Sequence, residues 1–189
     1  IFTLVGEGGS AQGEFKGTMP ADGARYTVTY PANYNENVLA NQTYVENGFG
    51  NGLMKMTGEG TLDNGFALSA ANALLGLQIK GDITLGKIKV TNFQDNSKNY
   101  TLNCAGVALT ASAKLFYIVL PAERWKHGFT AEVYDAEDNL IKSFTNPTDL
   151  TFSATSALMM PEIVVNQPTA QPEDSYELRI LTFEDDDAQ

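Results

Sequence analysis

The residues whose side chains could most readily support catalysis or ligand binding lie together in one short segment, Arg124-Trp125-Lys126-His127. Trp125 is the only tryptophan and His127 the only histidine of the 189-residue chain. An indole flanked by cations can stack on a sugar ring or take part in cation–π contacts. A histidine can act as a base or a metal ligand, but metal sites need several convergent ligands and the chain has no second histidine. The alternative is structural: after Pro121 ends a strand, the segment crosses between strands and its tryptophan caps a packed sandwich.

Other reactive groups give weaker signals. Cys104 lies in an apolar alternating stretch, as a small buried residue does, and a lone cysteine excludes an internal disulfide. The glycine-rich segments 6–9 and 48–52 are not followed by a helix start, so we interpret them as turns and not as phosphate loops. Neither acidic stretch has the Asp-x-Asp-x-Asp-Gly pattern of a calcium loop. A glycosidase would need two carboxylates that flank a cleft, and the sequence does not show which of its many Asp and Glu side chains lie close together. Hairpin tips and a solvated terminus account for the acidic groups Glu132, Asp135, Glu137, Asp138 and 184–187.

The net charge of −11 limits the range of partners. No basic stripe is available to neutralise nucleic-acid phosphates or to dock on anionic lipid. No apolar run approaches the ~20 residues of a membrane helix. Because the chain opens with Ile1 and not Met, we expect a processed or trimmed form whose export signal has been removed.

The hydrophobic pattern predicts an all-β fold of antiparallel sandwich type. Short alternating runs are separated by turn residues about every 8–12 positions. Only residues 68–79 tolerate a helix, and the β-branched continuation of that run favours a strand. Residues 31–50 are rich in Asn and predict an ordered surface loop. The expected strands are 2–5, 14–18, 25–30, 52–57, 66–69, 75–79, 87–93, 100–103, 115–120, 129–135, 140–144 and 160–165.

A glycine-rich stretch at 58–65 predicts a domain boundary. We expect an incomplete N-terminal β-domain over 1–64, a complete β-sandwich over 65–165, and a linker with an isolated strand over 166–189. Within the last segment, "YELRILTF" alternates like the first strand of a further domain or an added edge strand.

An ordered series of motifs resembles the fimbrillin-like proteins of Bacteroidales. A strand ending in "VLP" is followed by "GF", then by a strand with an acidic hairpin turn, and later by "MP", all between residues 115 and 161. Upstream, "RYTVTYP", the glutamine-containing "NQTYVENGFGNGLMKM" and "LLGLQIKGDITLGKIKV" are compatible with the same family. The departures are the missing strands before Ile1, Leu53 in place of a proline, and a tail that resembles the start of another surface-protein domain.

The resemblance implies tandem transthyretin-like sandwiches, the first partly truncated, in an exported cell-surface or outer-membrane protein. It implies a non-catalytic fimbrial or adhesin subunit, anchored in the membrane only through a segment absent from this chain. Its partners would be other subunits joined by strand addition, a mode that exposed sheet edges invite. The candidate strand-exchange residues are Met160, Ile163, Val165, Leu178 and Ile180.

The alternative function is a glycan-binding module of a larger surface lipoprotein. Its candidate stacking residues are Trp125, Tyr134 and Tyr44, next to the Asn-rich loop. We expect no catalytic residue, no metal ligand and no cofactor, and no nucleic-acid partner. If the protein is such a glycan-binding module, its expected ligand is a host or dietary glycan.

Overall fold

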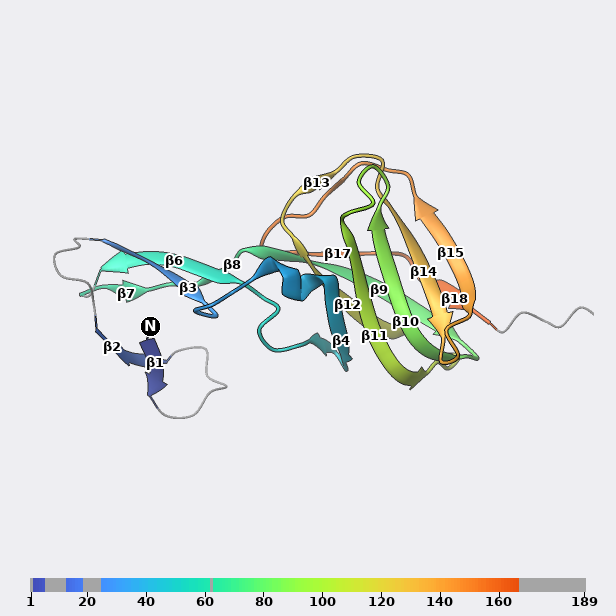
Figure 1. Ribbon diagram of the computed structural model, residues 1–189, viewed down its shortest axis with the longest axis horizontal. Helices are drawn as coiled ribbons and strands as arrows, with labels where there is room; N and C mark the ends of the chain where they lie inside the picture. The colour runs from blue at the N-terminus through green and yellow to red at the C-terminus, as the bar shows by residue number, and fades with distance from the viewer. Residues whose placement is uncertain (1, 6–12, 19–24, 62, 167–189) are drawn as a thin grey trace, which may run out of the picture.

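The computed structural model describes residues 2–5, 13–18, 25–61 and 63–166, and strands dominate it (Figure 1). The predicted all-β sandwich is confirmed: two sheets pack face to face. The large sheet has the order β15-β14-β10-β11-β4-β5. Its strands are β15 (Leu140–Asn146), β14 (Phe129–Asp135), β10 (Thr84–Asn92), β11 (Asn99–Ala108), β4 (Asn41–Val45) and β5 (Gly48–Phe49).

The small sheet is built around one long central strand, β9 (Asn72–Gly81). On one side β9 pairs antiparallel with β12 (Lys114–Pro121). On the other side it pairs in parallel with two short strands, β17 (Ala157–Met159) and β18 (Ile163–Val165). The run that tolerated a helix therefore forms a strand, because partners on both sides bury it and suit a nearly continuous apolar sequence.

The core lies between the inner faces of the two sheets. β14 shows the alternation most clearly, since Phe129, Ala131 and Val133 are fully buried and the residues between them are partly exposed. Leu75 and Leu77 of β9 face them from the small sheet with no exposed surface. Each buried side chain of this size stabilises the fold by about 1.5–3 kcal/mol.

The remaining strands form smaller sheets. β3 (Tyr26–Tyr30) pairs with β6 (Met56–Thr61), which also pairs with β7 (Gly65–Phe66) and β8 (Ser69–Ala70). These four strands lie beside the sandwich in Figure 1. Two further pairs join β1 (Phe2–Val5) to β2 (Glu14–Gly17) and β13 (Arg124–Trp125) to β16 (Leu150–Thr151). Among the described residues the buried core belongs to the sandwich, so a tandem second sandwich stays a prediction.

The structure differs from the sequence predictions about local structure in several places. The surface loop expected over 31–50 contains a 3-10 helix, η1 (Glu36–Ala40), and the strands β4 and β5. β4 pairs in parallel with β11 across the predicted boundary at 64/65, and the division into domains stays a prediction. The strand expected over 52–57 begins later, at Met56, and the strand expected over 160–165 is shorter, since only β18 at Ile163–Val165 falls in that range.

Gln42 covers the free edge of β12. This side chain is 3% exposed. Its Oε1 accepts a hydrogen bond from the Val119 N–H at 2.9 Å, and its Nε2 donates to the Val119 carbonyl at 2.8 Å. Nε2 also donates to the Leu39 carbonyl at 2.9 Å, which ties the end of η1 to the same point. The amide thus pairs with β12 as the backbone of a neighbouring strand would, and it satisfies groups that are costly to bury unpaired.

The other long edge strand, β15, is protected in a different way. Lys142 lies opposite buried Val133, so its side chain leaves the strand on the core side. Its Nζ donates to the Val164 carbonyl of β18 at 2.7 Å and bridges the two sheets at their rim. Ile141 is the extra residue of a bulge. A bulge and an inward-pointing charge both oppose the addition of another strand.

In the described part of the chain, no helix is long and apolar enough to cross a membrane.

Replacing Gln42 by Leu should lower the free energy of unfolding by about 2–4 kcal/mol, because two buried backbone groups of Val119 lose their partners. Urea denaturation measures the loss. The matched control is Gln78→Leu on the partly exposed face of β9, which should change stability by only about 0.5 kcal/mol. Equal losses in the two variants would show that the amide does not protect the β12 edge.

Candidate functional site

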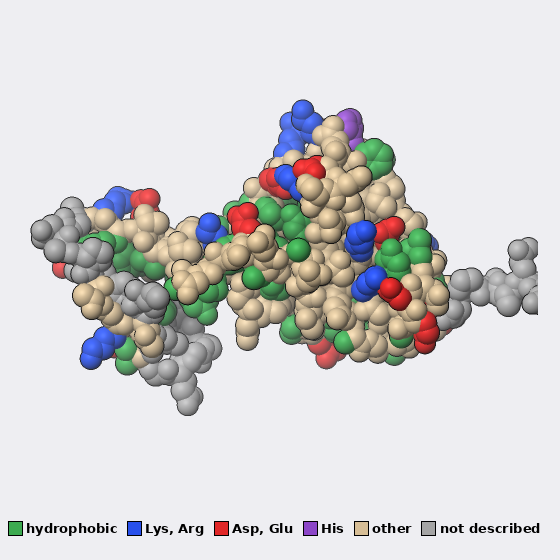
Figure 2. Space-filling model, in the orientation of Figure 1, with side chains coloured by type: hydrophobic (Ala, Val, Ile, Leu, Met, Phe, Trp, Pro, Cys, Tyr) green, Lys and Arg blue, Asp and Glu red, His purple; other side chains and the backbone are tan. Residues whose placement is uncertain are grey.

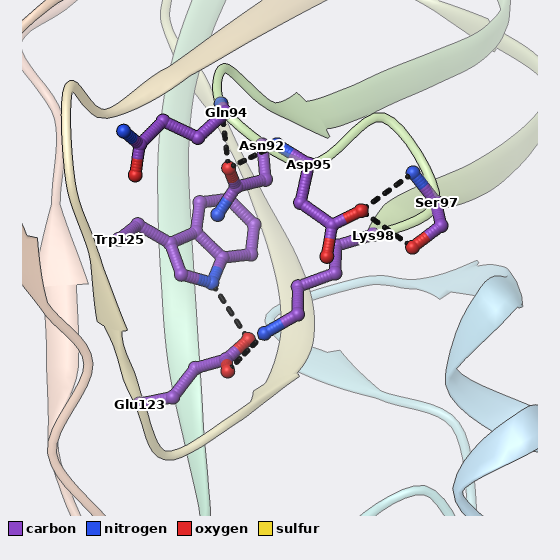
Figure 3. A network of polar contacts seen from close by, with 7 residues as sticks. All are labelled: Asn92, Gln94, Asp95, Ser97, Lys98, Glu123 and Trp125. Carbon is purple, nitrogen blue, oxygen red and sulfur yellow. Dashed lines mark hydrogen bonds and ion pairs between the residues drawn. The ribbon is translucent and has the colours of Figure 1, made fainter.

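Trp125 lies in the core and presents no face to solvent. Its indole is 0% exposed. The ring stacks near Tyr100, with centroids 6.0 Å apart, and meets the edge of Phe152 at 4.9 Å. Its Nε1 donates a hydrogen bond to Glu123 Oε1 at 2.8 Å (Figure 3). In this arrangement the indole fills the end of the sandwich and is not available for stacking on a sugar.

The polar network around Trp125 fastens two loops to each other (Figure 3). The second carboxylate oxygen of Glu123 forms an ion pair with Lys98, which precedes β11. In the same turn, Asn92 Oδ1 accepts hydrogen bonds from the N–H groups of Gln94 and Asp95 at 2.8 and 3.0 Å. These contacts satisfy the backbone of the β10–β11 turn, as Asn side chains often do. The network therefore has a structural explanation.

His127 contributes its backbone to the same end of the sandwich. Its φ is +57° and that of Gly128 is +69°, and a Cβ on Gly128 would lie 1.8 Å from the Asn146 carbonyl oxygen. Asp149 Oδ1 accepts a hydrogen bond from the His127 N–H at 2.9 Å, and Oδ2 accepts one from Arg124 Nη2 at 2.7 Å. The His127 N–H, followed by Arg124, lowers the pKa of the Asp149 carboxyl. These contacts favour the structural interpretation of the segment from Arg124 to His127.

Cys104 is buried on the inner face of β11. The thiol is 1% exposed, and burial raises its pKa to about 12. A thiolate is the reactive form of cysteine, so this environment makes the side chain inert at neutral pH. Across the described residues, no group of three or more His, Cys, Asp or Glu side chains is placed to hold a metal ion.

Tyr44 and Tyr134, the other two candidate stacking residues, have different environments. Tyr44 packs at the rim of the core against Phe116, with ring centroids 5.0 Å apart. Tyr134 lies on the solvent side of β14 and is partly exposed. The Nζ of Lys87, its cross-strand neighbour, lies 4.6 Å from the centre of the Tyr134 ring. Of the three predicted residues, Tyr134 is the one that the fold leaves on an open surface.

The candidate strand-exchange residues serve their own sandwich as far as they are described. Met160 and Val165 are 8% and 1% exposed, and Ile163 packs partly buried against the core. Leu178 and Ile180 lie outside the described residues.

Tyr134 belongs to a surface that we call the polar sheet face, the solvent side of the large sheet. Strand register places its side chains in three rows that cross the sheet. One row contains Thr43, Asn103, Lys87 and Tyr134, and it ends at Leu140, which is 50% exposed. The next contains Asn41, Thr101, Lys89, Glu132 and Ser143. The third contains Asn99, Thr91, Thr130 and Thr145. Hydroxyl and amide groups thus dominate this face.

Two shallow hollows lie on the polar sheet face. The first has a volume of about 510 Å³ and is lined by Asn103, Lys87 and Asp138, among others. It forms where β10 and β11 bulge at residues with little or no side chain, Gly86 and 105–106. The second, of about 420 Å³, is lined by Lys89, Thr91, Asn92, Phe93, Asn96, Thr130 and Glu132.

The charges on the polar sheet face neutralise one another. Lys87 Nζ lies 2.5 Å from Asp138 Oδ1, and Lys89 Nζ lies 3.7 Å from Glu132 Oε2. The hydrogen bond between Lys87 and Asp138 raises the pKa of the Lys87 ammonium group. Figure 2 shows basic and acidic side chains next to each other over this part of the molecule. The whole chain has a net charge of −11, but on this face each of these lysines is paired with a carboxylate.

Sequence reasoning found Tyr134 but missed the rest of the polar sheet face. The available signal was the polar half of each alternating strand, at 87, 89 and 91 and again at 101 and 103. These positions are recognisable one strand at a time. Their gathering into rows depends on the order of strands in the sheet, which local pattern does not contain.

Comparison with known proteins finds no family model and no curated protein that matches this chain. The resemblance to fimbrillin-like proteins therefore rests on the motifs alone and stays a prediction.

The pH dependence of stability should reveal the role of Asp149. Because folding lowers its pKa, the charged form stabilises the protein above the unfolded pKa of about 3.9, and this contribution is lost as pH falls through the folded pKa. An Asp149→Asn variant should be less stable than the wild type at pH 6, and the difference should narrow below about pH 4. Urea denaturation across this range measures it.

Arg124→Gln is the matched comparison, because it leaves the hydrogen bond from the His127 N–H in place. It should retain most of the wild-type pH dependence. A difference between wild type and Asp149→Asn that stays constant down to pH 2.5 would contradict the role assigned to this carboxylate.

Proposed function

We propose that this protein is a non-catalytic adhesion module of the fimbrillin-like kind, which acts at the cell surface and holds a glycan on the polar sheet face. The polar sheet face itself is the observation that supports the proposal. An adhesion surface needs accessible hydrogen-bonding groups on a rigid support, and strands are more precise supports than loops. Here the hydroxyl and amide rows are carried by paired strands.

The two outer faces of the sandwich differ in chemistry. On the small sheet the solvent side carries the apolar groups Leu74, Tyr117 and Met159, the last 39% exposed, together with Gln78 and Lys80. On the large sheet the corresponding side carries Thr, Asn, Lys and Glu. Hydroxyl and amide groups can both donate and accept hydrogen bonds, as a polyhydroxylated ligand requires. The polar sheet face is therefore the better candidate for glycan contact.

Replacing Tyr134 by Ala should weaken glycan binding by about tenfold, which corresponds to an aromatic contact worth about 1.4 kcal/mol. Binding is measured on a glycan microarray and then by calorimetry on the best ligand. The matched control is Tyr117→Ala, on the outer side of the small sheet, with thermal unfolding used to check both variants. Equal binding by the two variants, or no glycan bound by the wild type, would refute the proposal.

A second candidate function is assembly into fimbriae by strand exchange. The segment that contains β17 and β18 favours it, because this segment lies in parallel along β9 and inserts Met160 and Val165 into the core. A segment of this kind can in principle fill the same groove of a neighbouring copy. The edges at β12 and β15 are protected against strand addition, so the β9 groove is a better candidate for exchange than either of them.

If exchange occurs, protein refolded from urea at high concentration should form oligomers, and an excess of a peptide of residues 157–166 should suppress them by filling the groove. The control peptide carries Val165→Asp, which places a charge at a buried position and should have no effect. Size-exclusion chromatography measures the oligomers. A protein that stays monomeric throughout would count against assembly by this segment.

A further inference from the structure

The polar sheet face is longer than a single sugar site, and its two hollows follow one strand. Lys87 of β10 lines the first hollow, while Lys89 and Thr91 line the second. The second hollow continues to Phe93, the residue that follows the end of β10. From Lys87 to Phe93 the strand advances by about 20 Å, at roughly 3.4 Å per residue.

An aromatic side chain lies at each end of this path. Tyr134 is in the row of Lys87. At the other end Phe93 is 56% exposed, although a large apolar side chain gains stability by burial. Its backbone is fixed, since its N–H donates a hydrogen bond to the Gly128 carbonyl at 3.1 Å. An exposed ring on a fixed backbone costs little entropy when it stacks on a ligand.

The groups between the two rings indicate the charge and polarity of the ligand. Thr91 and Thr130 present hydroxyl groups at the second hollow, and Lys89 is paired with Glu132 in the middle of the path. Because the lysines on this face already have acidic partners, the face complements a neutral ligand. The net charge of −11 also disfavours a polyanion, through long-range repulsion.

We propose that the polar sheet face binds a linear, neutral polysaccharide that lies along β10, with Tyr134 and Phe93 contacting sugar rings at its two ends. This inference rests on the proposed function and adds to it the extended form of the ligand and the second aromatic contact. The hydroxyls of Thr91 and Thr130 and the Lys89–Glu132 pair bind the sugars between the two rings. Ligand length therefore determines affinity.

The test uses the full chain and a microarray of neutral linear glucans, mannans, xylans and galactans, followed by oligosaccharides of the polysaccharide that binds best. Calorimetry should show affinity rising from the monosaccharide up to the oligomer that spans ~20 Å and levelling off beyond it. Phe93→Ala should weaken binding of the spanning oligomer by about tenfold and leave the shortest binding oligomer unaffected.

The matched control is Phe15→Ala, which removes a similarly exposed ring (48%) on β2, outside the polar sheet face. The inference is overturned if a short oligomer already reaches full affinity, or if Phe93→Ala and Phe15→Ala bind the long oligomer equally well. Tyr134→Ala distinguishes the proposed function from the extended path. If Tyr134→Ala weakens binding and Phe93→Ala does not, the proposed function survives without the extended path. If another glycan binds but no neutral polysaccharide does, the inference fails and the proposed function survives, and if no glycan binds, both fail.

Discussion

The packing of two apolar sheet faces against each other is the interaction on which the rest of this structure depends. β9 and β12 provide one face, while β10, β11 and β14 provide the other, and the side chains between them are almost completely buried. Because strand side chains alternate, burying one face of the large sheet places every second residue in solvent. The polar sheet face is thus a direct consequence of the core.

The ends and edges of the sandwich are closed by polar contacts. At one end Trp125 fills the space between the sheets, and Glu123 links its indole to the β10–β11 turn through Lys98. At one edge the Gln42 amide pairs with β12, and at the opposite rim Lys142 reaches from β15 to β18. Together these contacts limit strand addition and leave the polar sheet face as a broad accessible surface.

The most distinctive residues of the sequence do not form the candidate site. Trp125 and His127 are the only residues of their types, yet the structure uses the indole as core and the histidine mainly through its backbone N–H. The candidate site consists instead of ordinary residues such as Thr91, Asn103 and Tyr134. Their potential lies in their arrangement, since a single threonine or asparagine on a strand is typical of any solvated sheet.

Alternation of apolar and polar residues was enough to predict the all-β class and most strands of the sandwich. The turn residues at 138–139 predicted the hairpin at Asp138, whose φ is +70°. Those features depend on neighbours in the chain. The tertiary structure alone decided that the Asn-rich segment joins the large sheet, that Gln42 covers β12 and that Trp125 is enclosed. The pairing of β4 with β11 spans some sixty residues, from Thr43 to Asn103. No local pattern encodes such a contact, because its stability comes from groups that meet only after the chain has folded.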